Sequence, residues 1–157
     1  MLLILHNIRS VHNVGSIFRT ADAAGVSKII LSGYTPGPVD RFNLPRKDFT
    51  KVSLGAEKTI PWEQTKTLAA AISRLKKEGF YIVAVEQAKG STPLFTFKKP
   101  KNKPVALVLG NEVRGISKQS LKLVDEVVEI PMRGKKESLN VSVAAGIAMF
   151  TLTNKKL

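Results

Sequence analysis

The stretch VALVLGNEVRG, residues 105–115, determines the fold that we expect for this chain of 157 residues. Its first five residues form an unbroken apolar run, which is typical of a central parallel strand covered on both faces. Ligands of parallel α/β sheets bind beyond the carboxyl ends of the strands, and a glycine there lets a ligand approach the backbone closely. Gly110, Asn111 and Glu112 are therefore a candidate site. On this pattern alone, a tight turn with a capping side chain explains them equally well.

The segments on either side of this strand predict further strands that alternate with helices. Val14, Ile17 and Ala21 recur at helical spacing, and Gly25 ends the run as a C-terminal cap does. Strand–helix–strand units favour parallel sheets, so we expect an α/β protein with a parallel sheet flanked by helices. The expected strands are 2–5, 28–31, 81–85, 105–109 and 127–130, the expected helices are 14–24, 68–75 and 138–152, and residues 33–50 are expected to form a loop.

The expected last helix, residues 138–152, is apolar almost all round. A helix without a polar face must be covered on both sides, and the sheet covers only one of them. A partner subunit is the simplest second cover. The sequence therefore predicts a homodimer.

The composition argues against several kinds of site and compartment. The chain has no cysteine and only two histidines, which excludes disulfides and thiolate sites and leaves too few ligands for a typical zinc site, so we expect no metal. No stretch approaches the roughly 20 apolar residues of a membrane helix. The opening run MLLIL is too short for a signal peptide. We therefore expect a cytoplasmic protein without a membrane partner.

The charge indicates a nucleic acid as the partner. Lys and Arg number 25 against 12 Asp and Glu, and the resulting net charge of +13 attracts polyanions. An anionic membrane surface is the competing partner, but it calls for a basic amphipathic helix with a bulky apolar face, which we do not find. Because the basic residues concentrate in loops, we favour nucleic acid over a general effect of lysine on solubility.

A second segment with polar residues that packing does not require is NVGSIFRTADAAG, residues 13–25. Arg19 falls on the polar side of the expected helix. Asn13 and Gly15 lie at its start, where free backbone N–H groups can bind an anion. Taken alone, an ordinary helix cap and a solvated arginine explain the segment better.

A third segment of this kind is EIPMRGKKESLNVSVAAG, residues 129–146. A strand ends before Pro131, a basic loop follows, and Ser138 opens the last helix. Ser138 alone is equally compatible with a simple N-cap.

Together, the three segments resemble the SpoU-type (TrmH-like) branch of the SPOUT RNA methyltransferases. That family has an early motif with Asn, Gly and Arg, a G-N-E-x-x-G motif after a strand, and a closing I-P-M…S-L-N-V-S motif. The chain carries all three in the family's order, and the resemblance covers nearly its whole length. It implies that residues 1–157 are a single SPOUT methyltransferase domain with an α/β fold and a C-terminal trefoil knot. The matching residues are Asn13, Gly15 and Arg19, then 110–115, 130–132 and 138–142.

The resemblance also implies an S-adenosyl-L-methionine-dependent enzyme that methylates a ribose 2′-hydroxyl of RNA, with its active site at a homodimer interface. In the family, the arginine that matches Arg19 assists deprotonation of the hydroxyl. An arginine is a poor base because its free pKa lies above about 12, so a substrate phosphate helps, or Arg19 only stabilises the developing oxyanion. Asn140 would orient the hydroxyl or the arginine. Glu112 would organise its loop, by pairing with a basic group, and Ser138 would contact substrate or cofactor. Asn13 completes the catalytic set.

The family holds its cofactor in the knotted loops, and basic loops would hold RNA phosphates. The expected cofactor-binding residues are Val85, Glu86, Leu109, Gly110, Asn111, Ile130, Met132, Ser138 and Leu139. The expected RNA-binding residues are Arg9, Arg41, Arg46, Lys47, Lys51, Lys135 and Lys136, with a further basic group at residues 98–103.

Alternatives to this assignment stay open. Transfer RNA is the expected substrate because the chain is as short as relatives that modify the tRNA wobble position, and ribosomal RNA is the alternative. A non-catalytic RNA-binding or ribosome-assembly protein with the same fold is a rival, against which Arg19, Glu112, Ser138 and Asn140 argue. An enzyme that methylates a base nitrogen is a second rival.

Overall fold

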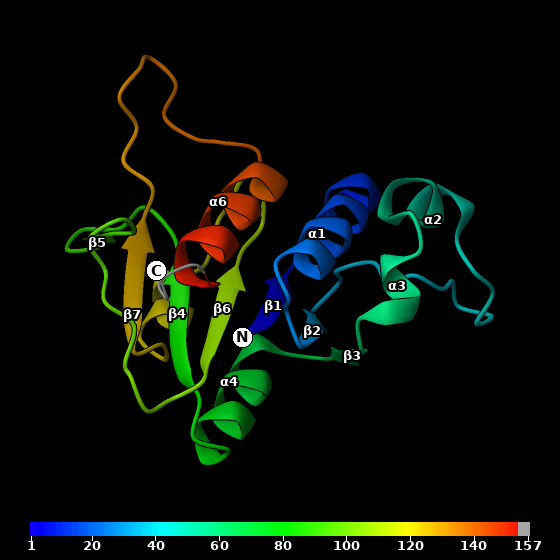
Figure 1. Ribbon diagram of the computed structural model, residues 1–157, viewed down its shortest axis with the longest axis horizontal. Coiled ribbons are helices and arrows are strands. Elements are labelled where there is room, and N and C mark those ends of the chain that lie inside the picture. The colour runs from blue at the N-terminus through cyan, green and yellow to red at the C-terminus, as the bar shows by residue number, and fades with distance from the viewer. Residues whose placement is uncertain (154–157) are drawn as a thin grey trace.

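The computed structural model describes residues 1–153, which form one seven-stranded parallel sheet with helices on both faces (Figure 1). The strand order is β3-β2-β1-β6-β4-β7-β5. The predicted α/β class with a helix-flanked parallel sheet is confirmed. The strands are β1 (Leu2–His6), β2 (Lys28–Ser32), β3 (Trp62–Thr65), β4 (Tyr81–Val85), β5 (Thr92–Pro93), β6 (Val105–Leu109) and β7 (Glu126–Glu129). The helices are α1 (Val11–Ala23), α2 (Lys47–Ser53), α3 (Ala56–Thr59), α4 (Leu68–Lys77), α5 (Lys118–Leu121) and α6 (Val141–Thr153).

β6 lies in the middle of the sheet, between β1 and β4, as its unbroken apolar run predicts. All of its residues are buried. Leu107 and Leu109 join the core cluster to which α1 and α6 contribute, whereas Ala106 and Val108 join the cluster of α4. Because each face of β6 meets a helix layer, neither face leaves room for a polar side chain.

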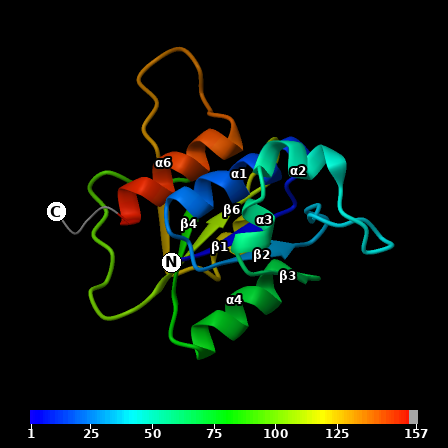
Figure 2. The ribbon, with the colours of Figure 1, turned by 45° about the vertical axis from the view of Figure 1, so that its right-hand side comes forward.

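Helices α1, α2 and α6 lie on one face of the sheet and α4 lies on the other (Figure 2). α1 approaches α2 closely at Gly15, where a Cβ atom would lie 3.1 Å from the carbonyl oxygen of Phe49 and 3.2 Å from Cβ of Val52. The rings of Phe18 and Phe49 meet edge to face at the same contact, with centroids 5.2 Å apart. Gly15 is thus buried inside α1 and serves helix packing, so its predicted place at an anion-binding helix start is wrong.

The last helix begins at Val141, later than the predicted start at Ser138. Asn140 precedes it, and its side-chain Oδ1 accepts hydrogen bonds from the backbone N–H of Ser142 at 2.8 Å and from the Ser142 hydroxyl at 2.6 Å. Residues 131–140 consequently form a long loop between β7 and α6 (Figure 1). Ser138 belongs to this loop and is not an N-cap.

Other differences from the sequence-based expectation are short elements. The predicted loop at 33–50 gives way to α2 at Lys47, and the last strand ends at Glu129. β3, β5, α3 and α5 were not predicted. Each is only two to four residues long, which is too short for a hydrophobic period to develop.

Candidate active site

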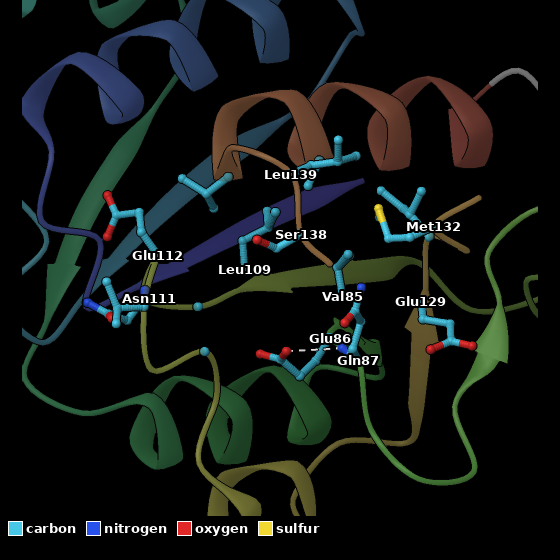
Figure 3. A pocket seen from close by; sticks show the side chains of 16 residues that line it. Val85, Glu86, Gln87, Leu109, Asn111, Glu112, Glu129, Met132, Ser138 and Leu139 are labelled. Atoms are coloured by element: carbon cyan, nitrogen blue, oxygen red, sulfur yellow. Dashed lines mark hydrogen bonds between the residues drawn. The ribbon is translucent and has the colours of Figure 1, made fainter. Parts of the chain in front are cut away.

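A cavity of about 220 Å³ lies at the carboxyl ends of β4, β6 and β7, the edge at which parallel sheets bind ligands (Figure 3). The loops that follow these strands form its walls, together with the start of α6. Every residue that the sequence assigned to the cofactor lines it: Val85, Glu86, Leu109, Gly110, Asn111, Ile130, Met132, Ser138 and Leu139.

Two glycines shape the loop after β6. A Cβ atom at Gly110 would lie 2.5 Å from Cγ1 of Ile116 and 2.8 Å from the carbonyl carbon of Gly115. Gly115 has φ of +62°, and a Cβ there would lie 2.2 Å from Oε2 of Glu86. Neither position therefore accepts a side chain without movement of the loop, which explains the spacing of glycines in GNEVRG.

Asn111 fastens the same loop from inside. Its Oδ1 accepts hydrogen bonds from the backbone N–H groups of Val113 and Arg114 at 2.9 and 2.8 Å. Its Nδ2 donates to the backbone carbonyl of Asn7 at 2.8 Å and to the Tyr34 hydroxyl at 3.0 Å. Asn111 is thus the capping side chain of a tight turn, and it also lines the cavity. The explanation of this motif as a turn and its explanation as a candidate site are therefore compatible.

Glu86 is fixed in the cavity by backbone donors. Its Oε2 accepts from the N–H of Ile116 at 2.8 Å. Its Oε1 accepts from the N–H of Gln87 at 3.0 Å, the bond drawn as a dashed line in Figure 3. Each oxygen keeps a lone pair for a further donor. Gln87 in turn donates from Nε2 to the carbonyl of Glu137 at 2.8 Å, which joins the loop after β4 to the loop 131–140.

Glu112 joins the loop after β6 to the start of α1. Its carboxylate accepts from the backbone N–H groups of Arg9 at 3.0 Å and Ser10 at 3.1 Å, and from Nδ2 of Asn13 at 3.0 Å. Glu112 organises its loop as predicted, but its partners are amides and not the basic group that we expected. The anion at the start of α1 is therefore supplied by the chain itself, where the helix dipole favours negative charge.

These donors set the pKa of Glu112. Burial alone raises the pKa, but hydrogen bonds from the backbone of Arg9, of Glu112 itself and of Ser10, and from the Asn13 side chain, outweigh burial and hold it below its ordinary value. A lowered folded-state pKa means that the carboxylate stabilises the fold above the unfolded value, near pH 4.3, and that this stability is lost as pH falls through the folded value.

Glu112→Gln is accordingly expected to lower the free energy of unfolding by about 0.3 to 1 kcal/mol at neutral pH, the range for a carboxylate at a helix N-terminus. The difference from the unmodified protein should shrink as pH falls below about 4.3 and through the lowered folded-state pKa, because the carboxylate then becomes protonated and uncharged like the amide. Urea denaturation across this pH range measures it. Glu137→Gln is the control, because the described residues donate no hydrogen bond to its carboxylate; a pH-independent gap for Glu112→Gln would contradict the assignment.

A hydrogen bond between Asn13 and Asn140 brings the first and third motifs together. Nδ2 of Asn140 donates to Oδ1 of Asn13 at 3.1 Å, and Asn13 donates to Glu112. Three residues of the predicted catalytic set, Asn13, Glu112 and Asn140, therefore lie together in the structure. A fourth, Ser138, lines the adjoining cavity.

Arg19 does not join this group. It lies on the exposed side of α1, six residues beyond Asn13, which is about 9 Å along the helix axis. It is not among the residues that line the cavity of its own chain.

The basic residues assigned to RNA are mostly exposed, with two differences from the expectation. Arg46 makes two hydrogen bonds to Asp48, at 3.2 and 3.0 Å, so a phosphate would compete with this carboxylate. Lys99 donates to the carbonyl of Leu152 at 2.9 Å and thereby caps the end of α6. The other residues assigned to RNA, Arg9, Arg41, Lys47, Lys51, Lys135 and Lys136, are exposed and form no ion pair within residues 1–153.

Sequence reasoning missed some of the cavity wall. Glu129 ends β7, and Val141 and Ala144 come from the first turn of α6. Glu129 carried a signal, because it lies at the carboxyl end of a strand. Val141 and Ala144 carried none, since an apolar residue on an apolar helix looks the same whether it faces the core or a ligand.

No cluster of His, Asp or Glu suited to a metal ion occurs in residues 1–153. Nor is any helix in this part of the chain long and apolar enough to span a membrane.

Comparison with known proteins gives a match over most of the chain. A family model described as the SpoU rRNA Methylase family matches residues 1–150. A 23S rRNA (guanosine-2'-O-)-methyltransferase of Vibrio parahaemolyticus is 32% identical to this chain over 157 residues, which are 100% of this chain and 60% of that protein. The chain thus spans about 60% of the length of this curated relative.

Solved structures give the same result. An AdoMet-bound rRNA methyltransferase from Sinorhizobium meliloti superposes with a TM-score of 0.87 at 33% identity, over 99% of this chain and 56% of that chain. The A. aeolicus TrmH/SpoU tRNA modifying enzyme superposes with a TM-score of 0.83 at 29% identity, over 99% of this chain and 75% of that chain.

Proposed function

This chain belongs to the SpoU rRNA methylase family, and on that premise we propose that it transfers a methyl group from S-adenosyl-L-methionine to a ribose 2′-hydroxyl of RNA. One observation carries the proposal: residues from 85–87, 109–115 and 129–144, which lie far apart in the sequence, line one cavity at the carboxyl ends of the strands. The S. meliloti relative of similar fold was crystallised with AdoMet, which supports the choice of cofactor.

The cavity wall suits this cofactor. Leu109, Ile130 and Leu139 offer an apolar surface for an adenine ring. Glu86 holds two carboxylate oxygens, each with a spare lone pair, where ribose hydroxyls can donate. When bound, the cofactor supplies a methyl group on a sulfonium, which an oxygen nucleophile can attack.

The residues of this chain would then prepare the ribose hydroxyl. Asn140, held by Asn13, is placed to orient the hydroxyl, and Asn13 is itself fixed by the Glu112 carboxylate. Arg19 would draw the hydroxyl proton toward a substrate phosphate or stabilise the oxyanion that forms. A cation in this place lowers the energy of the developing negative charge whichever of these holds.

We propose that a second copy of the chain brings Arg19 to the site, because Arg19 does not line the cavity of its own chain. α6 offers the matching interface. Val143 is 50% exposed and Phe150 is 41% exposed, and Ile147 between them is half-buried, so they form an apolar stripe at helical spacing. Such a stripe on a surface helix favours contact with a partner.

Phe150→Glu is expected to convert a dimer into a monomer, because a charge in the stripe would be buried without a partner. Size-exclusion chromatography with light scattering measures the mass. Leu123→Glu is the matched control, since Leu123 is similarly exposed at 39% but lies in the turn before β7. A wild-type protein that is monomeric at micromolar concentration, or a Phe150→Glu variant that stays dimeric, would contradict this interface.

Ribosomal RNA is the substrate that we propose, in place of the transfer RNA that the size of the chain favoured. The Vibrio relative is named for a guanosine of 23S rRNA, and the S. meliloti relative is named as an rRNA methyltransferase. The A. aeolicus relative is named as a tRNA modifying enzyme and matches at lower identity.

The proposal includes three features that rest on the family resemblance: residues 1–157 as one catalytic domain, a C-terminal trefoil knot, and a cytoplasmic location. In a knotted fold, the loops around the cofactor would be held by chain threading as well as by hydrogen bonds such as that of Gln87 to Glu137.

The test has two steps. Isothermal calorimetry with S-adenosyl-L-methionine should give binding, and the protein should then transfer a labelled methyl group to unmodified ribosomal RNA at a ribose oxygen. Loss of label on exchange of the target 2′-hydroxyl for hydrogen would identify the acceptor. Binding of RNA without binding of cofactor would indicate a non-catalytic RNA-binding protein with the same fold. Label on a base nitrogen would indicate an enzyme that methylates bases instead of ribose.

A further inference from the structure

A second depression, of about 710 Å³, lies along the loop between β2 and α2, a loop that projects from the body of the molecule (Figure 2). Tyr34, Arg41, Phe42, Arg46 and Gln64 are among its walls. It is joined to the cofactor cavity through one contact, because Asn111 lines that cavity and donates to the hydroxyl of Tyr34.

Tyr34 presents a fixed aromatic ring at the near end of this depression. Its backbone N–H donates to Oδ1 of Asn7 at 3.3 Å, and its hydroxyl accepts from Asn111 at 3.0 Å. The residue is nevertheless 58% exposed. A ring that is held at its hydroxyl and at its backbone and still faces solvent is prepared for a flat ligand, because little side-chain entropy is lost on binding.

Phe42 presents a second ring, at the tip of a turn that its neighbours build. Oδ1 of Asp40 accepts from the backbone N–H groups of Phe42 at 2.8 Å and Leu44 at 3.0 Å. Asn43 closes the turn with φ of +61°. Phe42 is left 67% exposed, and the guanidinium carbon of Arg41 lies 4.7 Å from its ring centroid. The turn thus holds an aromatic ring and a stacked cation in solvent.

The geometry points to a binding site for an unpaired RNA segment next to the methylated nucleotide, with one base stacked on Tyr34 and another on the Phe42 ring with its Arg41. Exposed aromatic rings among cations are what single-stranded nucleic acid requires, since every base has a face that stacks and every nucleotide has a phosphate. The nearby Lys47, which is exposed and forms no ion pair within residues 1–153, supplies further positive charge. The bases of a duplex are already stacked on each other and present no face to these rings. The inference rests on the proposed function for its choice of RNA.

The test measures the affinity of fluorescent oligouridine RNA, single-stranded or paired with oligoadenosine, at one fixed salt concentration. Phe42→Ala is expected to weaken single-strand binding about ten-fold, within the range known for loss of one base–aromatic stack, and Phe42→Tyr should keep it. Duplex binding should not change. Phe95→Ala is the matched control, because Phe95 is 57% exposed but follows β5, at the other edge of the sheet.

Unchanged single-strand binding by Phe42→Ala would overturn the inference. Equal losses for single strand and duplex would overturn it too, because they would indicate phosphate contacts alone, and so would an equal loss in Phe95→Ala. Calorimetry with S-adenosyl-L-methionine on the same proteins separates this inference from the proposed function. If the cofactor binds and Phe42→Ala leaves RNA binding intact, only the stacking site fails; if the unmodified protein binds no cofactor, the enzymatic proposal fails by itself.

Discussion

Replacement of Arg19 by alanine is expected to lower the rate of methyl transfer on the order of 10²- to 10³-fold, the usual cost of removing one stabilising donor from a developing oxyanion. The affinity for S-adenosyl-L-methionine should not change, because Arg19 does not line the cavity of its chain. Transfer of labelled methyl to ribosomal RNA measures the rate, and calorimetry measures the affinity.

Lys77→Ala is the control for this variant. It removes one exposed positive charge from α4, on the face of the sheet opposite to α1, and so tests whether net charge alone matters. Mixed dimers give a sharper result. In a dimer of one Arg19→Ala subunit and one Asn140→Ala subunit, one active site contains both an intact Arg19 and an intact Asn140 if Arg19 acts across the interface. Such a mixed dimer should regain activity, although each variant alone has lost it. Full turnover by Arg19→Ala alone would refute its role.

Gly110→Ala is expected to weaken cofactor binding roughly 10- to 100-fold, because overpacking of a tight site costs about 1 to 3 kcal/mol. The new Cβ would lie 2.5 Å from Ile116 Cγ1 and 2.9 Å from its backbone nitrogen. That nitrogen carries the N–H that holds Glu86. Displacement of Ile116 would therefore move the Glu86 carboxylate as well as the loop, and calorimetry would detect the loss.

Gly134→Ala gives a matched control in another loop near the cavity. A Cβ at Gly134 meets no atom within 4 Å, so the same chemical change adds no clash. Gly134→Ala should bind cofactor as the unmodified protein does. If Gly110→Ala also binds normally, the loop after β6 is not a rigid part of the site.

The sequence predicted the centre of the fold and the residues that line the cavity for a physical reason. Because β6 is covered on both faces, all of its residues are apolar, and this run can be recognised in the sequence. The glycines that follow it mark positions with no room for a side chain. These are local signals. They need no knowledge of the rest of the chain.

The partners of Glu112 and the start of α6 could not be predicted in this way. Glu112 accepts from the backbone N–H of Arg9, a residue 103 positions away. A backbone N–H is present in every residue except proline, so the residue types do not reveal which one is the donor. Ser138 looked like a helix cap because serine commonly is one, but Asn140 makes that bond instead. The position of Arg19 relative to a second copy of the chain is also beyond a pattern of residues.

The place of β6 between β1 and β4 has a consequence for synthesis on the ribosome. β1 and β2 can pair early, but the strand that bridges them to β4 is made only at residues 105–109. Until then, β4 has neither of its neighbours, β6 and β7, and one edge of β1 stays open. A nascent chain that pauses before Val105 would expose unpaired strand edges, which favour aggregation, and the long-range pairing makes the final step slow. The apolar run that defines the fold therefore also joins the two halves of the growing sheet, and the remaining edge of β4 is covered only when β7 follows.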